Sequence, residues 1–293
     1  MKSALITGSS GFVGRHMHRE LVDRGYAVVD VDLVDGGDAL VTFKHSDRRF
    51  DLVVHAAATA PYRSAIDNIP GTFVQDMQLD SAMFNWAIRT RQYHVLYISS
   101  SAAYPIEVQN LDRVVKLTED EIDLDFPELP DGNYGWTKLT GERMAHAARA
   151  CDIPVTVVRP FSGYGEDQSP NWPFGAFVQR IRNGESPVKI WGSSSQTRDW
   201  IHISDVVKGA LAIVDAATDE PVNLCTGQAT AMGDLVDMMM NVAGYSASEQ
   251  RYLVDKTAPM GVMNRVGDPS RMYEYYEPKV TLEEGVARAL RNA

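Results

Sequence analysis

Three glycines that follow a short apolar run constrain the fold of this chain more than any other feature. Ala4–Ile6 predicts a buried strand, and a helical pattern begins at Phe12. Between and just beyond them lie Gly8, Gly11 and Gly14. In a strand–turn–helix of this spacing, the glycines permit a tight turn, close approach of backbone to phosphate, and close packing of helix on strand. The N–H groups at the helix N-terminus favour an anion there. The stretch therefore predicts a pyrophosphate-binding turn.

An acidic residue follows at the distance that a dinucleotide site requires. Asp32 lies in a second strand-like run, 27–33, and 24 residues after Gly8. A carboxylate at this offset accepts hydrogen bonds from the adenosine ribose and repels a 2′-phosphate. No Arg or Lys occurs between Asp32 and Lys44, so the pattern favours NAD over NADP. Asp30 points to the other strand face and is the weaker candidate.

Strand and helix patterns alternate through the first half of the chain. Strands are predicted at 50–58, 93–98 and 153–158, and helices at 72–91 and 134–150. This alternation predicts an α/β fold with a Rossmann-type, doubly wound parallel sheet. Stretches 34–50 and 105–133 show no clear pattern and are expected to be irregular. His55, inside a predicted strand, is expected to be a packed histidine.

The sequence pattern changes beyond residue 165, where the predicted loops become longer and richer in Pro and Gly. Helical patterns recur at 174–183, 204–217 and 231–243. We expect residues 1–165 to form the NAD-binding domain with the catalytic groups. Residues 166–293 should form mainly a smaller C-terminal α/β lobe that binds substrate, with some segments returning to the sheet. Ligands of such folds bind at the carboxyl edge of the sheet.

Composition limits the partners of this 293-residue chain. Its net charge of −11 disfavours nucleic acid and anionic membranes. Cys151 and Cys225 match no metal-ligand spacing, so we expect no metal and reduced thiols in a cytoplasmic protein. No apolar run approaches the ~18 residues of a membrane span. The first strand begins close to Met1, so no signal peptide is expected.

A tyrosine and a lysine lie four residues apart at the start of a predicted helix. At this spacing Tyr134 and Lys138 share one helix face. A nearby ammonium favours the phenolate, which makes the tyrosine usable as a base near neutrality. The serine run 99–101, which ends the preceding predicted strand, offers a hydroxyl for the same substrate oxygen.

Together these motifs resemble an extended short-chain dehydrogenase/reductase of the nucleotide-sugar epimerase/dehydratase group. The matching segments occur in the family's order and span most of the chain. They are TGSSGFVG at 7–14, Asp32, HAAA at 55–58, SSSAAYP at 99–105, YGWTK at 134–138, RPFSGYG at 159–165 and IWGSSSQTRDWIHISDV at 190–206.

The resemblance implies a role for each matching residue. Tyr134 would take the proton of a sugar hydroxyl, Lys138 would support that tyrosine and bond the nicotinamide ribose, and Ser100 would complete the catalytic set. Counting along the motif leaves Ser101 as the alternative serine. The residues implied to hold NAD are Gly8, Gly11, Phe12, Val13, Gly14, Asp32, Ala56, Ala57, Ala58, Ser99, Tyr134, Lys138 and Pro160. Those implied to contact a nucleotide-diphosphate sugar are Ser101, Trp191, Arg198 and Arg265. A homodimer through helices 72–91 and 134–150 is also implied.

Departures from the family pattern narrow the reaction. The dehydratases of the family carry Asp-Glu where this chain has Ser101-Ala102, and the 3,5-epimerases carry Cys at Ala102. Ser162 replaces a usual Asn, and Met260 an often basic residue. Simple redox at C4 remains, which favours a 4-epimerase that retains NAD. The alternatives are a nucleotide-sugar 4-ketoreductase, which consumes NAD(P)H, and a non-catalytic NAD-binding regulator.

Overall fold

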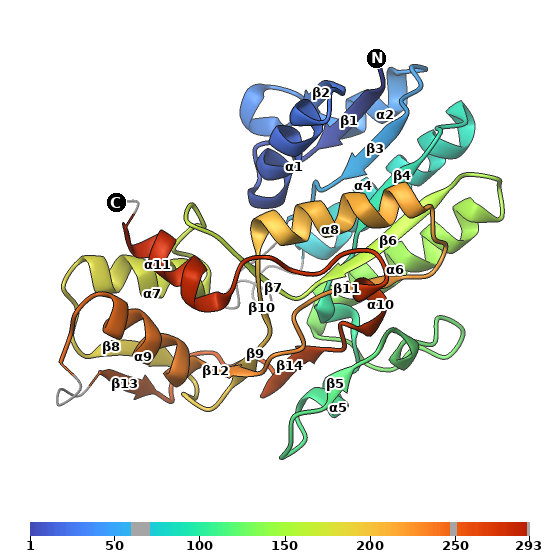
Figure 1. Ribbon diagram of the computed structural model, residues 1–293. Helices are drawn as coiled ribbons and strands as arrows, with labels where there is room; N and C mark the ends of the chain where they lie inside the picture. The colour runs from blue at the N-terminus through green and yellow to red at the C-terminus, as the bar shows by residue number, and fades with distance from the viewer. Residues whose placement is uncertain (60–70, 247–250, 292–293) are drawn as a thin grey trace.

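A six-stranded parallel sheet forms the centre of the molecule (Figure 1). The computed structural model describes residues 1–59, 71–246 and 251–291. In spatial order the strands are β2 (Ala27–Val31), β1 (Ser3–Thr7), β3 (Leu52–His55), β4 (Val95–Ile98), β6 (Val155–Pro160) and β11 (Val222–Leu224). All neighbours are parallel, and the order runs outward from β1 in both directions. The predicted doubly wound sheet is confirmed.

Helices cover both faces of this sheet. α1 (Phe12–Asp23) and α8 (Ile203–Ala216) lie on one face, and α2 (Ala39–His45), α4 (Gly71–Thr90) and α6 (Gly132–Arg149) lie on the other (Figure 1). Successive strand residues point to opposite faces, so Ile6 packs with α1 and α8, whereas Leu5 packs in the core under α4. Strands covered on both sides are apolar throughout, which is why their sequence shows them clearly.

A separate hydrophobic core holds the C-terminal lobe together. The lobe contains α7 (Pro173–Arg182), β8 (Val188–Trp191), α9 (Met232–Val242), β13 (Tyr252–Asp255) and α11 (Leu282–Arg291). Phe174, Leu235 and Val286 are buried together there, and β8 pairs with β13 in parallel. Between α8 and α9 the chain returns to the large sheet as β11. In Figure 1 the lobe lies beside the end of the sheet, at the lower left.

Short strands connect the lobe with the sheet. β12 (Thr230–Ala231), β9 (Thr197–Arg198), β14 (Asn264–Gly267) and β5 (Lys116–Leu117) form one small sheet in that order. β7 (Ser162–Tyr164) pairs with β10 (Trp200–His202). The remaining short elements are α5 (Ile106–Gln109), η3 (Glu119–Glu121) and α10 (Ser270–Tyr273).

The structure corrects three local predictions. The stretch 34–50, expected to be irregular, contains α2, whose N-terminus is capped by the side chain of Asp38 accepting from the Leu40 N–H at 2.8 Å. Residues 105–133, also expected to be irregular, contain α5, β5 and η3. The second strand ends at Val31, and Asp32 instead begins a short 3-10 turn, η1 (Leu33–Asp35), by accepting the Val34 N–H.

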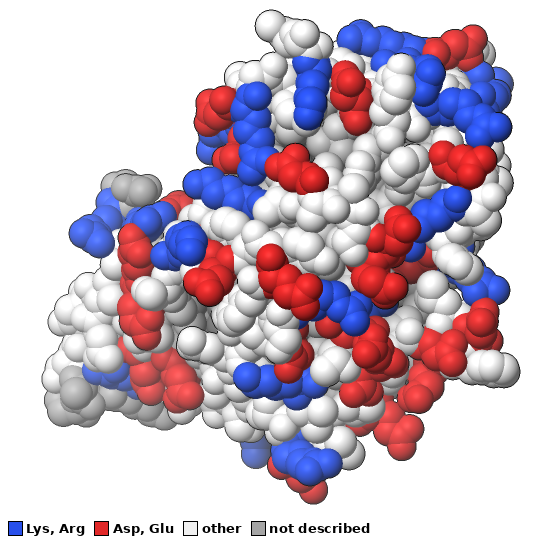
Figure 2. Space-filling model, turned by 45° about the vertical axis from the view of Figure 1, so that its right-hand side comes forward, with Lys and Arg blue, Asp and Glu red and all other residues white. Residues whose placement is uncertain are grey.

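Charge is unevenly distributed over the surface. In Figure 2 acidic side chains gather in the lower right of the view, and basic side chains lie mainly near its top. Among the residues in the described ranges, no helix is long and apolar enough to cross a membrane. Within the same ranges, no group of three or more His, Cys, Asp or Glu side chains is placed to hold a metal ion.

Candidate active site

The turn between β1 and α1 has a shape that only glycine permits at two positions. Gly8 has φ +74°, and its N–H donates to the Val31 carbonyl at 2.9 Å. A Cβ on Gly8 would lie 2.6 Å from the Ala57 nitrogen, at the end of β3. A Cβ on Gly14 would lie 2.0 Å from the Gly8 carbonyl oxygen. The turn is therefore packed against the carboxyl ends of β2 and β3, the two neighbours of β1, where the topology places a ligand.

The groups around this turn fit a dinucleotide. No side chain in the described part of the chain caps the N-terminus of α1, which begins after Gly11. Ser9 carries a buried hydroxyl that has no hydrogen-bond partner among the described residues. The small side chains of Ala56–Ala58 are half-buried beside the turn. Uncapped N–H groups and an orphaned hydroxyl suit phosphate oxygens, so the turn could hold the pyrophosphate of NAD.

Asp32 is held at the edge of the same turn. Its carboxylate accepts the Ser10 N–H and the Val34 N–H, both at 3.0 Å, and it stays half-exposed. Two backbone donors fix its direction and leave accepting capacity for ribose hydroxyls. Asp30, the weaker candidate, instead pairs with His18 of α1 at 2.8 Å.

The serine run lies at the carboxyl end of β4. Ser99 is buried and donates to Glu142 of α6. Ser100 is half-buried, and its hydroxyl oxygen accepts the Ala102 N–H at 3.1 Å, which starts a short turn, η2 (Ser101–Ala103). Ser101 is 4% exposed. Of the three hydroxyls, that of Ser100 is the most accessible from the carboxyl edge of the sheet.

The start of α6 is docked directly on this turn. The Asp131 N–H donates to the Ala102 carbonyl at 3.0 Å. A Cβ on Gly135 would lie only 2.4 Å from the same oxygen, so glycine allows the approach. Tyr134, between these two contacts, is therefore brought beside the segment that begins with Ser100.

Lys138 lies one helical turn further along α6, beneath Tyr134. It is 4% exposed, and its Nζ donates to the Ile98 carbonyl at 2.9 Å. The same Nζ lies 5.8 Å from the ring centre of Tyr134 and 5.2 Å from that of Tyr97. The three residues predicted to be catalytic thus come from two segments that the fold holds in contact.

A buried chain of hydrogen bonds, which no sequence motif predicts, lies near Lys138. His55 bonds Thr7 at 2.8 Å and Asp80 of α4 at 3.1 Å, which agrees with its expected role as a packed histidine. Tyr97 donates to Asp80 at 2.5 Å. Burial, followed by the charge of Asp80, raises the pKa of Tyr97 well above its usual value. Tyr97 is therefore a neutral donor under the active site.

Two acids on α4 share one buried face but have opposite shifts. Asp76 accepts the Thr59 N–H at 2.7 Å, and burial raises its pKa. For Asp80, burial acts in the same direction, but the hydrogen bond from His55, the charges of Lys138 and His55, and the hydrogen bond from Tyr97 outweigh it and lower its pKa. The ionised form is thus favoured by folding at Asp80 and disfavoured at Asp76.

Amide substitution of these two acids should change stability in opposite directions. At pH 7, Asp80→Asn is expected to lower the free energy of unfolding by about 1.5–3 kcal/mol, the typical worth of hydrogen bonds to a charged group. Asp76→Asn is expected to raise it, because the amide oxygen still accepts the Thr59 N–H without a buried charge. The two variants are each other's control, and urea unfolding curves compare them.

The pH dependence of the wild type provides a second check. The stabilising contribution of Asp80 is present above its unfolded pKa of 3.8 and is lost as pH falls through its lower folded pKa. The unfavourable contribution of Asp76 is fully present above its raised folded pKa, shrinks as pH falls below that value, and is absent below the unfolded pKa of 3.8. Asp76→Asn should therefore lose its advantage in mildly acidic buffer, and a shift of the same sign in both variants at pH 7 would contradict the assignment.

Two predicted substrate-binding arginines stand on adjacent strands. Arg198 of β9 and Arg265 of β14 are register partners in a parallel pair, so they share one face. Arg198 donates to the Thr197 carbonyl at 2.7 Å. Arg265 donates from Nε to Gln109 at 2.6 Å and from Nη2 to Asp131 at 2.7 Å. Two guanidinium groups on one face suit a diphosphate, although Arg265 is already engaged by side chains of this chain.

The remaining predicted residues lie apart from this face or at its edge. Trp191, at the end of β8, is 45% exposed, which leaves its ring accessible to a base. Gly192 follows Trp191, and Met260 packs against it, so Met260 lies close to Trp191. Pro160 ends β6 and is half-buried at the carboxyl edge of the sheet. Arg159 before it is fully buried and paired with Glu142 at 2.7 Å.

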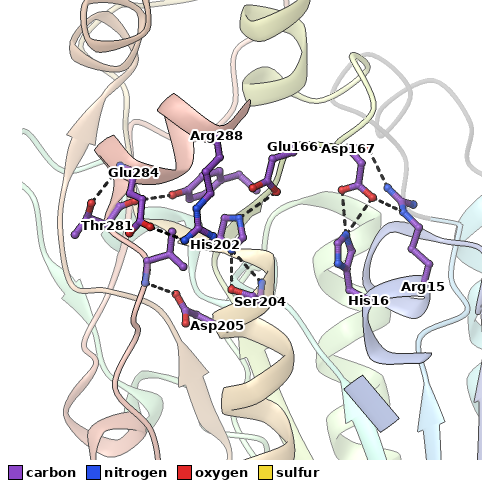
Figure 3. Close-up of polar contacts among 12 residues, drawn as sticks. Arg15, His16, Glu166, Asp167, His202, Ser204, Asp205, Thr281, Glu284 and Arg288 are labelled. Carbon is purple, nitrogen blue, oxygen red and sulfur yellow. Dashed lines mark hydrogen bonds and ion pairs between the residues drawn. The ribbon is translucent and has the colours of Figure 1, made fainter. Parts of the chain in front are cut away.

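The loop after β7 connects α1 with the elements around the lobe (Figure 3). Asp167 receives Arg15 Nε at 2.7 Å and lies 3.0 Å from Nε2 of His16, both on α1. The adjacent Glu166 faces His202 at 3.3 Å, and His202 in turn bonds Ser204 at the start of α8. His202 and Asp205 therefore make contacts within the fold; Asp205 accepts the Lys279 and Val280 N–H groups, each at 3.0 Å.

Comparison with known proteins places this geometry in a family. Residues 4–225 match the profile of the "NAD dependent epimerase/dehydratase family". A putative UDP-glucose 4-epimerase of Methanocaldococcus jannaschii is 25% identical over 311 residues, covering 98% of this chain and 96% of that protein. A dTDP-4-dehydro-6-deoxy-D-allose reductase of Streptomyces sp is 26% identical over 304 residues, covering 93% and 90%.

Solved structures share the whole fold. The UDP-glucose 4-epimerase of Thermotoga maritima, determined with UDP-glucose, has a TM-score of 0.85 at 25% identity, covering 98% of this chain and 97% of that one. The UDP-glucose 4-epimerase of Thermus thermophilus, in complex with NAD, has a TM-score of 0.81 at 18% identity, covering 99% of each chain. Because the family profile matches residues 4–225, which are most of its length, this chain belongs to the NAD dependent epimerase/dehydratase family.

Proposed function

We propose that the chain is an NAD-dependent nucleotide-sugar epimerase that inverts C4 through a transient 4-keto sugar. The observation that carries the proposal is the docking of α6 on η2, where the Asp131 N–H bonds the Ala102 carbonyl and Gly135 lies against it. This contact holds the start of α6, which carries Tyr134, against the turn that begins with Ser100. The glycine turn and Asp32 line the carboxyl edge of the sheet and would hold NAD, and residues 166–293 would supply most of the substrate-binding lobe.

Each side chain has one task in this reaction. NAD, held at the glycine turn and by Asp32, would supply reversible hydride transfer at C4 of the sugar. Tyr134 accepts the proton of the 4-hydroxyl and gives it back, because its phenol is the accessible group that can act as base and acid. The Nζ of buried Lys138 lies 5.8 Å from the Tyr134 ring centre, where its positive charge would attract the negative charge that develops on the tyrosine oxygen during proton transfer. Ser100 donates a hydrogen bond to the same sugar oxygen.

The lining of the site supports a reaction limited to C4. A dehydratase needs an acid and a base for the loss of water, but Ser101 and Ala102 occupy the places of those acids and are buried. Arg198, and Arg265 beside it, would contact the diphosphate, and Trp191 would border the nucleotide base. These assignments are carried over from the family pattern and are supported by the shared face of the two strands.

A 4-ketoreductase is the second candidate, since the chain resembles allose reductases of Streptomyces as closely as it resembles epimerases. Such an enzyme uses the same tyrosine, lysine and serine. It releases its cofactor in each cycle, whereas Asp32, fixed by two backbone N–H groups, favours NAD over the phosphorylated form. A non-catalytic NAD-binding regulator would need neither Tyr134 nor Lys138 in place.

The full chain tests these alternatives directly. Ligand released from the purified protein on denaturation is expected to be NAD, by mass spectrometry. Incubated with a panel of UDP-, GDP-, dTDP- and CDP-sugars, the protein should interconvert C4 epimers without added cofactor. Stoichiometric consumption of NAD(P)H with a 4-keto sugar would instead identify the reductase. Binding of NAD with no turnover across both assays would identify the regulator.

A further inference from the structure

The side chain of Arg265 connects three parts of the molecule. It lies on β14, whose neighbours are β9 with Arg198 on one side and β5 on the other. Its guanidinium is only 12% exposed and reaches away from the lobe toward the two segments that carry Ser100 and Tyr134. Two of its nitrogens bond side chains there, Nε to Gln109 and Nη2 to Asp131.

Gln109 links Arg265 to the serine segment. It is 1% exposed, and its amide nitrogen donates to the carbonyls of Tyr104 at 3.0 Å and Pro105 at 3.1 Å. These residues follow η2 directly. The amide therefore uses both its ends, accepting from the arginine and donating to the backbone that fixes the end of the Ser100 turn.

Asp131 links Arg265 to the tyrosine helix. It is the N-cap residue of α6, three positions before Tyr134, and its own N–H bonds the Ala102 carbonyl. Aspartate at this position ordinarily caps its helix with its side chain. Here no side-chain cap is formed in the described structure, and the carboxylate accepts Arg265 at 2.7 Å instead. The Asp131 carboxylate thus bonds Arg265 of β14, the strand beside Arg198, rather than the N–H groups of its own helix.

We propose that Arg265 is a positioning residue that, through Asp131 and Gln109, fixes Tyr134 and Ser100 relative to the strands that bind the sugar diphosphate. The expected effects of this role on kcat and KM rest on the proposed function. It goes beyond a direct contact to phosphate, because one guanidinium holds both catalytic segments before substrate arrives. The bond to a buried carboxylate is charge-assisted and directional, which suits a fixed spacing.

The variant Asp131→Asn distinguishes a positioning role of Arg265 from a role as a direct substrate contact. The change keeps the shape and removes the charge that orients Arg265. If Arg265 positions the site, kcat should fall on the order of 10- to 100-fold, the effect of a small misplacement of reacting groups, while KM changes less than about twofold. If Arg265 were only a substrate contact held back by Asp131, the same variant would bind substrate more tightly, and KM would fall with kcat unchanged.

A readout independent of turnover keeps the test valid even if the panel contains no substrate. Hydrogen exchange measured by mass spectrometry over the first turns of α6 should be faster in Asp131→Asn than in the wild type. The calorimetric Kd for UDP should stay within about twofold. Asp120→Asn is the matched control, because Asp120 pairs with Arg271 at 3.1 Å on the exposed surface, and it should leave kcat and exchange unchanged.

The outcomes test the positioning role of Arg265 separately from the proposed epimerase function. Slower turnover with unchanged KM and faster exchange supports positioning by Arg265. Unchanged exchange at the start of α6, or a lower KM with normal kcat, overturns it and leaves the epimerase proposal intact. An inactive wild type whose exchange still responds to Asp131→Asn supports the positioning contact and contradicts the proposed function.

Discussion

Tyr134→Phe should lower kcat by about 10²–10⁴-fold, the usual contribution of a positioned acid–base group. The side chain of Tyr134 is half-buried, and Phe has nearly the same shape, so the packing at the start of α6 should be kept. NAD should remain bound, because the glycine turn and Asp32 are unaffected. The measurements are kcat at saturating sugar nucleotide, the amount of NAD carried by the purified variant, and its unfolding midpoint.

Tyr93→Phe is the matched control for this change. Tyr93 is 54% exposed, precedes β4 at the opposite edge of the sheet, and stacks with Arg49 at 3.9 Å. It should turn over substrate like the wild type. Wild-type kcat in Tyr134→Phe would remove Tyr134 as the base, whereas loss of both activity and bound NAD would point to disturbed packing.

The sequence predicted those parts of the site that depend on local spacing. Gly8 and Gly14 lie in the turn of one βα unit, and Asp32 directly follows the next strand. The spacing of the glycines and the distance along the chain to Asp32 were therefore sufficient to predict them. Tyr134 and Lys138 share a helix face at a fixed spacing. The buried strands could be recognised because both their faces are covered, which makes them apolar throughout.

Contacts between distant segments could not be predicted in this way. Asp131 and Arg265 are 134 residues apart, and no periodicity links a strand of the lobe to the N-cap of a catalytic helix. Asp80 and Asp76 are acidic residues within a helix, yet they lie on its buried face and bond β3, β4 and the segment after β3. α2 was missed because its seven residues give too little pattern, although Asp38 marks its start.

A buried ion pair below the catalytic helix should control stability. Arg159 of β6 and Glu142 of α6 are each 1% exposed at the side chain, with Nη2 and Oε2 2.7 Å apart. Burial alone would lower the pKa of Arg159, but the adjacent Glu142 charge outweighs it and raises that pKa. Arg159 also donates to the Tyr104 hydroxyl at 3.1 Å and to the Glu119 carbonyl at 2.9 Å. The cation therefore stays charged, and Glu142 is the carboxylate to which it is hydrogen-bonded.

Glu142→Leu should lower the free energy of unfolding by about 3–5 kcal/mol, because it leaves a buried charge without its partner. The double variant Glu142→Leu/Arg159→Met removes both charges and should recover most of that loss, since an apolar pair of similar volume is often as stable as a buried ion pair. Urea unfolding midpoints, with the slope checked for constancy, give the differences.

The neighbouring residue offers the control for this experiment. Arg143 pairs with Asp125 at 2.6 Å on the surface, with side chains 52% and 69% exposed. Arg143→Ala should cost at most about 1 kcal/mol, because water already screens both charges. A double variant as unstable as Glu142→Leu would show that the loss comes from the hydrogen bond of Ser99 to Glu142 rather than from an unpaired charge. Recovery in the double variant would instead assign the loss of stability to the unpaired charge of Arg159. The end of β4, which leads into Ser100, would then not need the hydrogen bond from Ser99 to Glu142 for its stability.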